Sequence, residues 1–385
     1  MRGALALLVA LLALVVALPA SAGDIYLPEP GKAWFGSTDS DTLTNATLES
    51  SVLAGKRQVD IIHVYKAFSN YSGTKAFPGN SSAGVPLNNY VAAHKMLYLG
   101  YMPKIGGQPV AGGWAAVARG EYDAAYIDPF LTKLRDWSAA NGGKKVFIDF
   151  HHEADHDQKI SSAWGSSTDY RNAARHFIER AVALGARDAM IHVWTMGAGS
   201  GNPHIYHPMY PGDDVTDWLG YDPYGKVKHT SKTSSRTWHK TFGNDELDSA
   251  PDASSFYRFY DWCVGRGVKD AVDGKTYRKQ DIAAVPAADL TKPIMVAEFN
   301  SAYDPTLDKP NLSTWRTFWN GGVTEVGANR YPQVRAFLGF FSVSPQFDPR
   351  NDVGTGSVAN PSPGSILERF RALAALSRLN SGRPY

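Results

Sequence analysis

The chain has 385 residues, and its 39 Lys and Arg side chains nearly balance 37 Asp and Glu, which gives a formal net charge of +2 at pH 7. This balance offers no basic surface for nucleic acid or an anionic membrane, so we expect neither as a partner. Aromatic residues make up 12% of the chain, a surplus that would suit stacking on the apolar faces of sugar rings. The single cysteine, Cys263, lies in an apolar context, so we expect a buried thiol and no internal disulfide.

The first residues have the pattern of a secretory signal peptide. Arg2 supplies the positive charge, Leu5 to Leu18 is an unbroken apolar run, and Ala20-Ser21-Ala22 is a small-residue cleavage site. A membrane anchor is the less favoured alternative, because the run is short for a span and nothing basic follows it. We therefore expect residues 1–22 to be cleaved, and residues 23–385 to form one secreted, extracellular domain with no appended binding module. We expect this mature protein to be a monomer.

Eight short apolar runs alternate with helical patterns along the chain. Several are apolar at consecutive positions, which is typical of strands that are buried on both faces. Helical spacing with polar starts is found between them, for example over 128–143, 166–186 and 365–379. This alternation predicts an α/β fold, a single (β/α)8 TIM barrel, with a long polar loop over about 225–255 after the sixth strand. The runs are 32–38, 59–68, 97–104, 145–152, 189–196, 215–224, 293–299 and 334–343.

Two glutamates close two of these apolar runs. Glu153 directly follows the fourth run, and Glu298 ends the seventh. In a parallel barrel the reactive groups lie at the carboxyl ends of the strands, so both carboxylates are expected at the same end. Either glutamate alone could be a salt-bridged structural acid. A pair that faces one another across a sugar meets the requirement for glycoside hydrolysis, in which one carboxyl group protonates the leaving oxygen and the other attacks the anomeric carbon.

The segment His152-Glu153-Ala154-Asp155-His156 also fits the zinc-protease pattern H-E-x-x-H. That pattern requires a helix, so that the two histidines share one face. Here it follows a strand, and no further metal ligand is found at the expected spacing. A zinc protease is therefore the disfavoured alternative, and we expect no metal site.

Other residues at strand ends are candidates for supporting roles. His152 could donate a hydrogen bond near the sugar or the second carboxylate, and the Tyr224 hydroxyl could orient and help to ionise a neighbouring nucleophilic carboxylate. Trp34, Trp164 and Trp194 fall at or just after strand ends, so each could be a stacking platform for a sugar. For each tryptophan, packing in the core is the equal alternative.

Four segments, taken in order along the chain, resemble glycoside hydrolase family 26, the retaining β-mannanases and their relatives. The most specific is "YPGDDVTDWLGYDPY", which closely matches the family pattern Y-P-G-D-x-x-V-D-W-[IV]-G-x-D-x-Y, and "HVWTM" resembles the family's fifth strand. The four segments are "RGEYDAAYIDPFLTKLRDW" (119–137), "FHHEAD" (150–155), "YPGDDVTDWLGYDPY" (210–224) and "KPIMVAEFNS" (292–301).

Carried over position by position, the resemblance makes Glu153 the general acid/base and Glu298 the nucleophile. It places His152 beside the acid and makes Tyr224 the partner of the nucleophile, and Trp164 roughly matches an aromatic that follows the acid block. Two further positions are assigned to substrate binding, although they depart from the family pattern. These are Asp155, where the family usually has Asn, and Asn300, where Gly often follows the nucleophile. The last strand also lacks the tryptophan expected near the sugar.

The resemblance implies an enzyme that cuts within a β-linked polysaccharide with retention of configuration and needs no metal or organic cofactor. The preferred substrate is β-1,4-mannan, and mixed-linkage β-glucan and β-1,3-xylan are the alternatives on the same mechanism. A barrel that binds sugar without cutting it is the alternative of another class, favoured only by the altered eighth strand. The retaining mechanism predicts a separation of about 5–5.5 Å between the two carboxyl groups. It also predicts a raised pKa for Glu153.

Overall fold

The computed structural model describes residues 25–39, 45–197, 202–225, 255–282, 289–301, 312–340, 350, 352, 356–363 and 365–381. The expected signal peptide and nearly all of the expected polar loop lie outside these residues. Eight parallel strands form one closed barrel, which confirms the predicted (β/α)8 fold. They are β1 (Trp34–Thr38), β2 (Ile61–Ala67), β3 (Met96–Met102), β6 (Val146–Phe150), β7 (Met190–Gly197), β8 (Trp218–Asp222), β12 (Ile294–Ser301) and β13 (Val334–Gly339).

Each barrel strand coincides with one of the eight apolar runs of the sequence. The strands pair in chain order, and the ring closes because β13 pairs with both β12 and β1. The two-residue strand β9 (Tyr224–Gly225) extends the pairing at the carboxyl end of β12, where Asn300 lies opposite Tyr224. Two small antiparallel pairs lie outside the barrel, β4 (Lys104–Ile105) with β5 (Gln108–Pro109), and β10 (Val268–Lys269) with β11 (Thr276–Tyr277).

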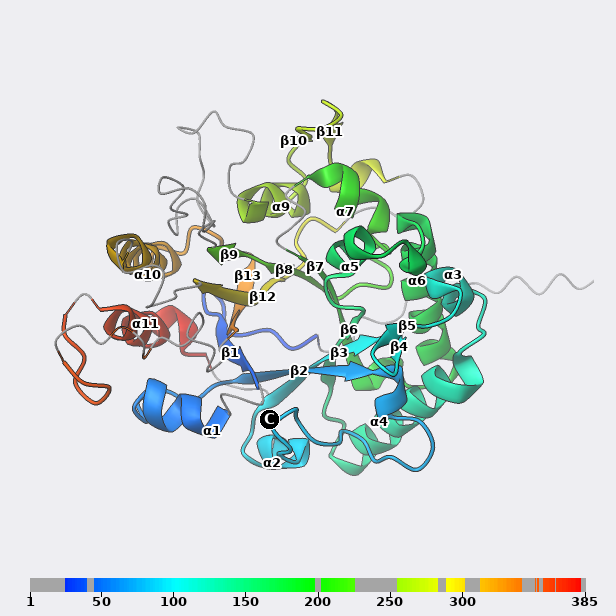
Figure 1. The fold of residues 1–385 in the computed structure, drawn as a ribbon, viewed down its shortest axis with the longest axis horizontal. Helices are drawn as coiled ribbons and strands as arrows, with labels where there is room; N and C mark the ends of the chain where they lie inside the picture. Colours follow the sequence, from blue (N-terminus) through cyan, green and yellow to red (C-terminus); the bar gives the residue numbers. More distant parts are fainter. Residues whose placement is uncertain are drawn as a thin grey trace, which may run out of the picture.

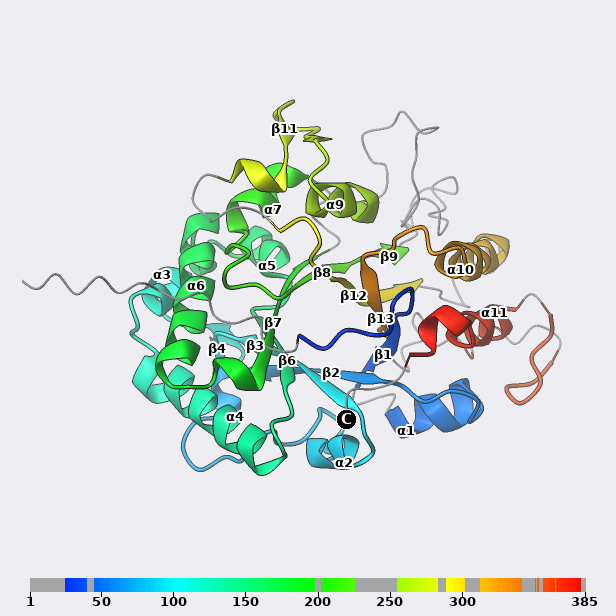
Figure 2. The ribbon, with the colours of Figure 1, turned by 180° about the vertical axis from the view of Figure 1, so that it is seen from behind.

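Helices surround the ring of strands, and both views of the molecule show them on its outside (Figures 1 and 2). The α-helices are α1 (Asn45–Thr47), α2 (Leu87–Ala92), α3 (Gly113–Ala118), α4 (Asp128–Ala140), α5 (Ala154–Ile160), α6 (Ser167–Ala183), α7 (Pro203–Met209), α9 (Ser255–Cys263), α10 (Leu312–Gly327) and α11 (Ile366–Ala374). Single turns of 3-10 or π-helix are η1 (Leu48–Val52), η2 (Phe68–Asn70), η3 (Asp123–Ile127), η4 (Ser162–Trp164), η5 (Arg187–Ala189), η6 (Lys279–Asp281) and η9 (Ser377–Leu379). No helix in the described ranges is long and apolar enough to cross a membrane.

The helix α6 shows how the sequence sets these boundaries. Ser166 caps its amino end by accepting from the Asp169 N–H, while Asp169 accepts from the Ser166 N–H in return. The left-handed Gly185 follows its last turn. Its buried positions face the outer surface of the barrel, where they join the larger apolar core. The same core contains Cys263, whose thiol is buried as expected.

The interior of the barrel changes from apolar to polar along the strands. A small apolar cluster, which includes Trp34 and Trp218 stacked at 6.0 Å between ring centroids, fills the amino-terminal half. Because alternate residues of a strand point to one face, the inward positions that follow Ile61 and Phe147 are His63 and Asp149. These polar side chains are fully buried. The fold therefore collects polar groups at the carboxyl ends of the strands, above an apolar plug.

Candidate active site

The Glu153 carboxyl group lies in a tight turn between β6 and α5. His151 and Glu153 both have left-handed backbones, with φ of 63° and 53°, and α5 begins immediately afterwards at Ala154. Such conformations cost about 1–3 kcal/mol for residues other than glycine, and they persist where surrounding contacts impose them. The turn directs Glu153 toward the last residue of β7, since a Cβ added to Gly197 would lie 2.8 Å from Glu153 Oε1.

A hydrogen-bond network around the buried His151 ring holds this turn. The Trp114 indole N–H donates to His151 Nδ1 at 2.8 Å, and His151 Nε2 lies 2.9 Å from Asp157 Oδ2. Because Nδ1 accepts a hydrogen bond, the neutral His151 ring carries its proton on Nε2. This N–H donates a hydrogen bond to Asp157 Oδ2. Burial lowers the pKa of His151, which favours this neutral form. Burial opposes ionisation of Asp157, but the His151 hydrogen bond and the Lys104 ammonium bring its pKa down to about 2.

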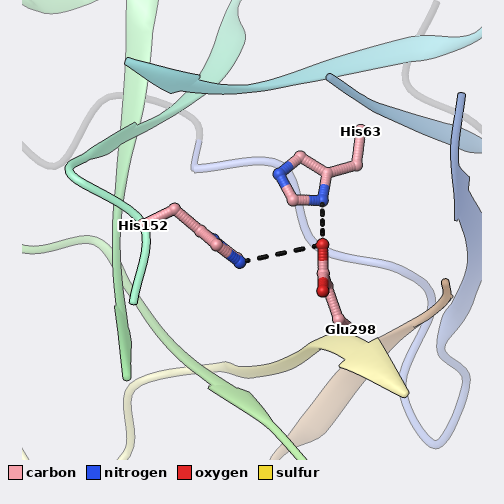
Figure 3. Close-up of side chains that lie close together, drawn as sticks. All are labelled: His63, His152 and Glu298. Carbon is pink, nitrogen blue, oxygen red and sulfur yellow. Dashed lines mark ion pairs between the residues drawn. The ribbon is translucent and has the colours of Figure 1, made fainter. Parts of the chain in front are cut away.

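The Glu298 carboxyl group lies on β12, across the barrel interior from this turn. It is only 4% exposed, and its Oε1 atom lies 3.5 Å from His63 Nδ1 and 3.8 Å from His152 Nε2 (Figure 3). Burial raises the pKa of Glu298 well above its ordinary value, while a hydrogen bond with Thr38 acts in the opposite direction. Glu298 is therefore a desolvated carboxyl group that is contacted by two imidazoles.

The imidazole of His152 lies between two buried carboxylates. Its Nδ1 atom is 3.1 Å from Asp149 Oδ2, and its Nε2 atom is 2.7 Å from Asp222 Oδ2. Burial disfavours the charged ring, but Asp222 and Asp149 outweigh that effect and raise the pKa of His152 well above its ordinary value. His152 is thus a buried cation close to Glu298, where it favours the ionised form of that carboxyl group.

Both glutamates converge on this one histidine. One ligand-type atom from each of His152, Glu153 and Asp222 lies within 4.8 Å of the others, and the same limit holds for His63, His152 and Glu298. Glu153 and Glu298 therefore lie at the same, carboxyl end of the barrel, as the sequence predicted from their positions after two strands. A buried cation between two carboxyl groups is an arrangement suited to general acid/base and nucleophilic chemistry.

Behind His152, a second layer of polar side chains fixes Asp149. The Tyr98 hydroxyl donates to Asp149 Oδ2 at 2.9 Å and lies 2.8 Å from Thr195 Oγ1. Space for the rings comes from Gly100 on β3, where an added Cβ would lie 3.3 Å from the Cβ of His152. Each of these polar groups stands inside an apolar strand, which was the available signal in the sequence. Five such residues were not predicted as members of the site, namely His63, Tyr98, Asp149, Thr195 and Asp222.

The three tryptophans take positions in the core. Trp34 is fully buried in the amino-terminal half of the barrel, far along the strand from the end where the glutamates gather. Trp194 is also fully buried, and it faces outward from β7 against Tyr210, with ring centroids 4.8 Å apart. Neither ring has an exposed face on which a sugar could stack. The prediction that Trp34 and Trp194 are stacking platforms is therefore wrong, and both pack in the core.

Trp164 has a supporting place instead. It is 2% exposed and its ring packs against His151, with centroids 4.2 Å apart, so it contacts the network that holds the Glu153 turn. Asp155 is fully buried, and its Oδ1 atom accepts from the Gly197 N–H at 2.8 Å, which ties α5 to β7. These contacts give both residues a structural position next to Glu153. The side chains of Tyr224 and Asn300 lie outside the described residues, although their backbones pair in β9 and β12.

The zinc-protease alternative does not fit this geometry. His152 and Glu153 precede α5, and only His156 lies on it, where its side chain is exposed. Among the described residues, His156 belongs to no group of potential metal ligands. The two histidines of the motif therefore do not share a helical face.

Solved structures with the same architecture were found, although no protein-family model matches the sequence and no curated protein matches it. A glycoside hydrolase family 26 β-mannanase from Bacteroides ovatus superposes with a TM-score of 0.53 at 17% identity, over 91% of this chain and 90% of that one. The fold is that of these mannanases. A Cellulomonas fimi endo-β-1,4-mannanase double mutant gives a TM-score of 0.54 at 16% identity, over 91% and 72% of the two chains. A family 26 endo-β-1,4-mannanase from a Bacillus species gives 0.54 at 14% identity, over 91% and 89%.

Proposed function

We propose that this protein is a secreted, retaining endo-β-glycosidase that hydrolyses β-1,4-mannan. The observation that carries the proposal is the convergence of Glu153 and Glu298 on the buried His152 at the carboxyl end of the barrel. The shared fold of the family 26 mannanases and the sequence resemblance support the same reaction class. Mixed-linkage β-glucan and β-1,3-xylan stay as alternative substrates, because the described side chains do not distinguish among these sugars.

In the proposed first step, Glu298 attacks the anomeric carbon while Glu153 protonates the departing glycosidic oxygen. Glu298 must be ionised to attack, and its burial opposes ionisation. The imidazolium of His152, 3.8 Å away, supplies the positive charge that offsets this cost. In the second step Glu153 acts as the base that activates water, and the glycosyl–Glu298 ester is hydrolysed.

The turn that holds Glu153 has a defined role in this scheme. The acid must stay within hydrogen-bond reach of the glycosidic oxygen in the first step and of water in the second. The left-handed turn, the His151 network and the absent side chain at Gly197 together hold the carboxyl group near His152 and the end of β7. No metal or organic cofactor enters the scheme.

The test uses the purified mature chain with galactomannan, glucomannan, barley β-glucan and β-1,3-xylan, with and without EDTA. We expect short oligosaccharides from a mannan, with a yield that EDTA does not reduce and that is nearly abolished in both Glu153→Ala and Glu298→Ala. Proton NMR of the first product should show the β-anomer, as retention requires. Absence of cleavage of every polymer would overturn the proposed activity, and wild-type rates in either variant would overturn the assigned pair.

A further inference from the structure

Two histidines and Glu298 form a potential metal-binding set that shares only His152 with the H-E-x-x-H motif. His63 comes from β2, His152 from the turn after β6 and Glu298 from β12, and their ring nitrogens and carboxylate oxygen point toward one another (Figure 3). Glu298 Oε1 lies 3.5 Å from His63 Nδ1 and 3.8 Å from His152 Nε2. Two histidines and one glutamate are a known ligand set of protein zinc sites.

The two separations from Glu298 are close to those around a tetrahedral ion. Zn²⁺ takes imidazole nitrogen and carboxylate oxygen at about 2.0–2.2 Å, which places neighbouring ligand atoms of a tetrahedron roughly 3.3–3.6 Å apart. The separation from His63 falls in this range, and the separation from His152 exceeds it by a few tenths of an ångström. We propose that His63, His152 and Glu298 bind a divalent transition-metal ion such as Zn²⁺.

The surroundings of each histidine support this assignment. His63 is fully buried, and within the described part of the chain neither of its ring nitrogens makes a hydrogen bond. Buried polar atoms normally make hydrogen bonds. Among the described residues the His63 ring makes none, and it faces the Glu298 carboxyl group, so its nitrogen is available to bind an ion. His152 Nδ1 contacts Asp149 Oδ2 at 3.1 Å. A carboxylate on the second nitrogen is the common arrangement behind a metal-binding histidine, and Nε2 would bind the ion once it has lost its proton.

The charge balance also favours a cation. Asp149, Glu153, Asp222 and Glu298 bring four carboxyl groups into the region that holds His152. Asp222 Oδ2 lies 2.7 Å from His152 Nε2, so the ion would take the place of the proton that this nitrogen shares with Asp222, and that proton is released to solvent. An ion would therefore meet carboxyl oxygens here, not an apolar surface.

The consequence is inhibition, and this part rests on the proposed function. A metal bound to Glu298 Oε1 takes up the lone pair that would attack the anomeric carbon, so the occupied enzyme is inactive. The ion would act as an inhibitor that competes with the sugar, and chelation would raise activity or leave it unchanged. This is the reverse of a zinc protease, which a chelator silences.

The decisive experiment reads metal binding without using activity. The EDTA-treated mature protein is titrated with Co²⁺, whose visible absorption intensifies on four-coordinate binding, and Zn²⁺ is then added to displace it. We expect one equivalent of Co²⁺ to bind and Zn²⁺ to displace it. Binding should weaken at least roughly 10-fold in His63→Gln and in Glu298→Gln, which retain side-chain volume and remove one ligand each. His156→Ala, which removes the exposed histidine of the motif, should bind as the wild type does.

Circular dichroism shows whether each variant is folded. If one of the two ligand variants does not fold, the other still tests the site. Absence of the four-coordinate Co²⁺ spectrum in the folded wild type would overturn the site, as would unchanged binding in both ligand variants. Loss of Co²⁺ binding in His156→Ala would show that the H-E-x-x-H segment binds the metal, and it would overturn the proposed ligand set. Zn²⁺ inhibition of polysaccharide cleavage is measured separately, so an inactive protein that binds Co²⁺ would contradict the proposed function and leave the metal site standing.

Discussion

Glu153, in the turn after β6, lies against Gly197 at the end of the neighbouring strand β7, so that a Cβ added to Gly197 would lie 2.8 Å from Glu153 Oε1. Gly197 does not have a left-handed φ, and the space it leaves is occupied by the end of a flexible side chain. Gly197 is therefore needed to leave room for the Glu153 carboxyl group, and not to allow a special backbone conformation in β7.

Gly197→Ala should lower kcat about 10-fold or more while changing the free energy of unfolding by little, because displacement of an acid by about 1 Å is costly for catalysis and cheap for packing. Steady-state kinetics and urea unfolding measure the two effects. Gly327→Ala is the matched control, because a Cβ there meets its nearest atom at 3.6 Å, an ordinary contact. Unchanged kcat in Gly197→Ala would contradict the role of this glycine.

Glu298→Gln should abolish turnover and stabilise the fold at neutral pH. The amide cannot attack, so we expect kcat to fall by roughly 10³-fold or more. Burial raises the pKa of Glu298, so the folded wild type is stabilised only while that group is protonated. Relative to the variant, the wild type should lose stability as pH rises from the ordinary glutamate pKa to the raised one. The loss is about 1.4 kcal/mol for each pH unit that separates these two pKa values.

Thermal unfolding of Glu298→Gln and the wild type between pH 3 and pH 8 measures this difference. The two melting temperatures should coincide at the acidic end, where the wild-type carboxyl group is protonated, and separate as pH rises. A variant that is less stable than the wild type at neutral pH would show that the ionised Glu298 is stabilised in the fold.

Asp222→Asn should lower the pKa of His152, because it removes the carboxylate that holds the ring in its charged form. In the wild type the raised pKa means that the stability from this ion pair is fully present below the unfolded-state value of about 6.5 and is lost as pH rises through the folded-state value. The variant should show a flatter alkaline stability curve.

The alkaline limit of kcat/KM in Asp222→Asn should also move to lower pH, because the pKa of His152 falls when its carboxylate partner is removed. Histidine NMR titration reports the His152 pKa directly, and a pH–rate profile reports its effect on catalysis. Asp214→Asn, at a surface pair with Arg175, controls for the loss of a carboxylate elsewhere. An unchanged His152 titration in Asp222→Asn would contradict the proposed coupling.

His151→Phe should lower both stability and kcat. The phenyl ring has a similar shape, but it leaves the Trp114 N–H and the Asp157 carboxylate without their His151 contacts. Each lost partner costs about 1–3 kcal/mol for a buried group, and the left-handed turn that carries Glu153 loses its support. Urea unfolding and kcat measurements test this.

His156→Ala changes an exposed histidine of the same segment and should stay within about 0.5 kcal/mol of the wild type. Conservative replacement by Gln at position 151, which retains a donor for Asp157, should recover part of the lost kcat. Equal losses in the Phe and Gln variants would assign His151 a packing role only.

The sequence predicted the architecture because each barrel strand is a local feature. An apolar run such as 145–152 or 293–299 is long enough for one strand, and the helical patterns between the runs leave only parallel pairing. Glu153 and Glu298 could be placed at the same end for the same reason, since parallel strands have their carboxyl ends together.

The other residues of the site could not be predicted from the sequence, because they come together from segments that are far apart in the chain. His63, Asp149 and Asp222 come from three strands, and they lie around His152 only because the closed barrel brings the inward faces of these strands together. The tryptophans were misplaced because proximity to a strand end does not say which face of the strand a side chain takes. Trp34 points inward at the amino-terminal level and Trp194 points outward.

The strands, their order and the two glutamates that end them follow from hydrophobic periodicity, which is a property of neighbouring residues. The raised pKa of His152, the desolvation of Glu298 and the left-handed turn at His151 and Glu153 could not be predicted in this way. These properties depend on burial and on partners from distant strands, and both arise only when the ring of strands closes.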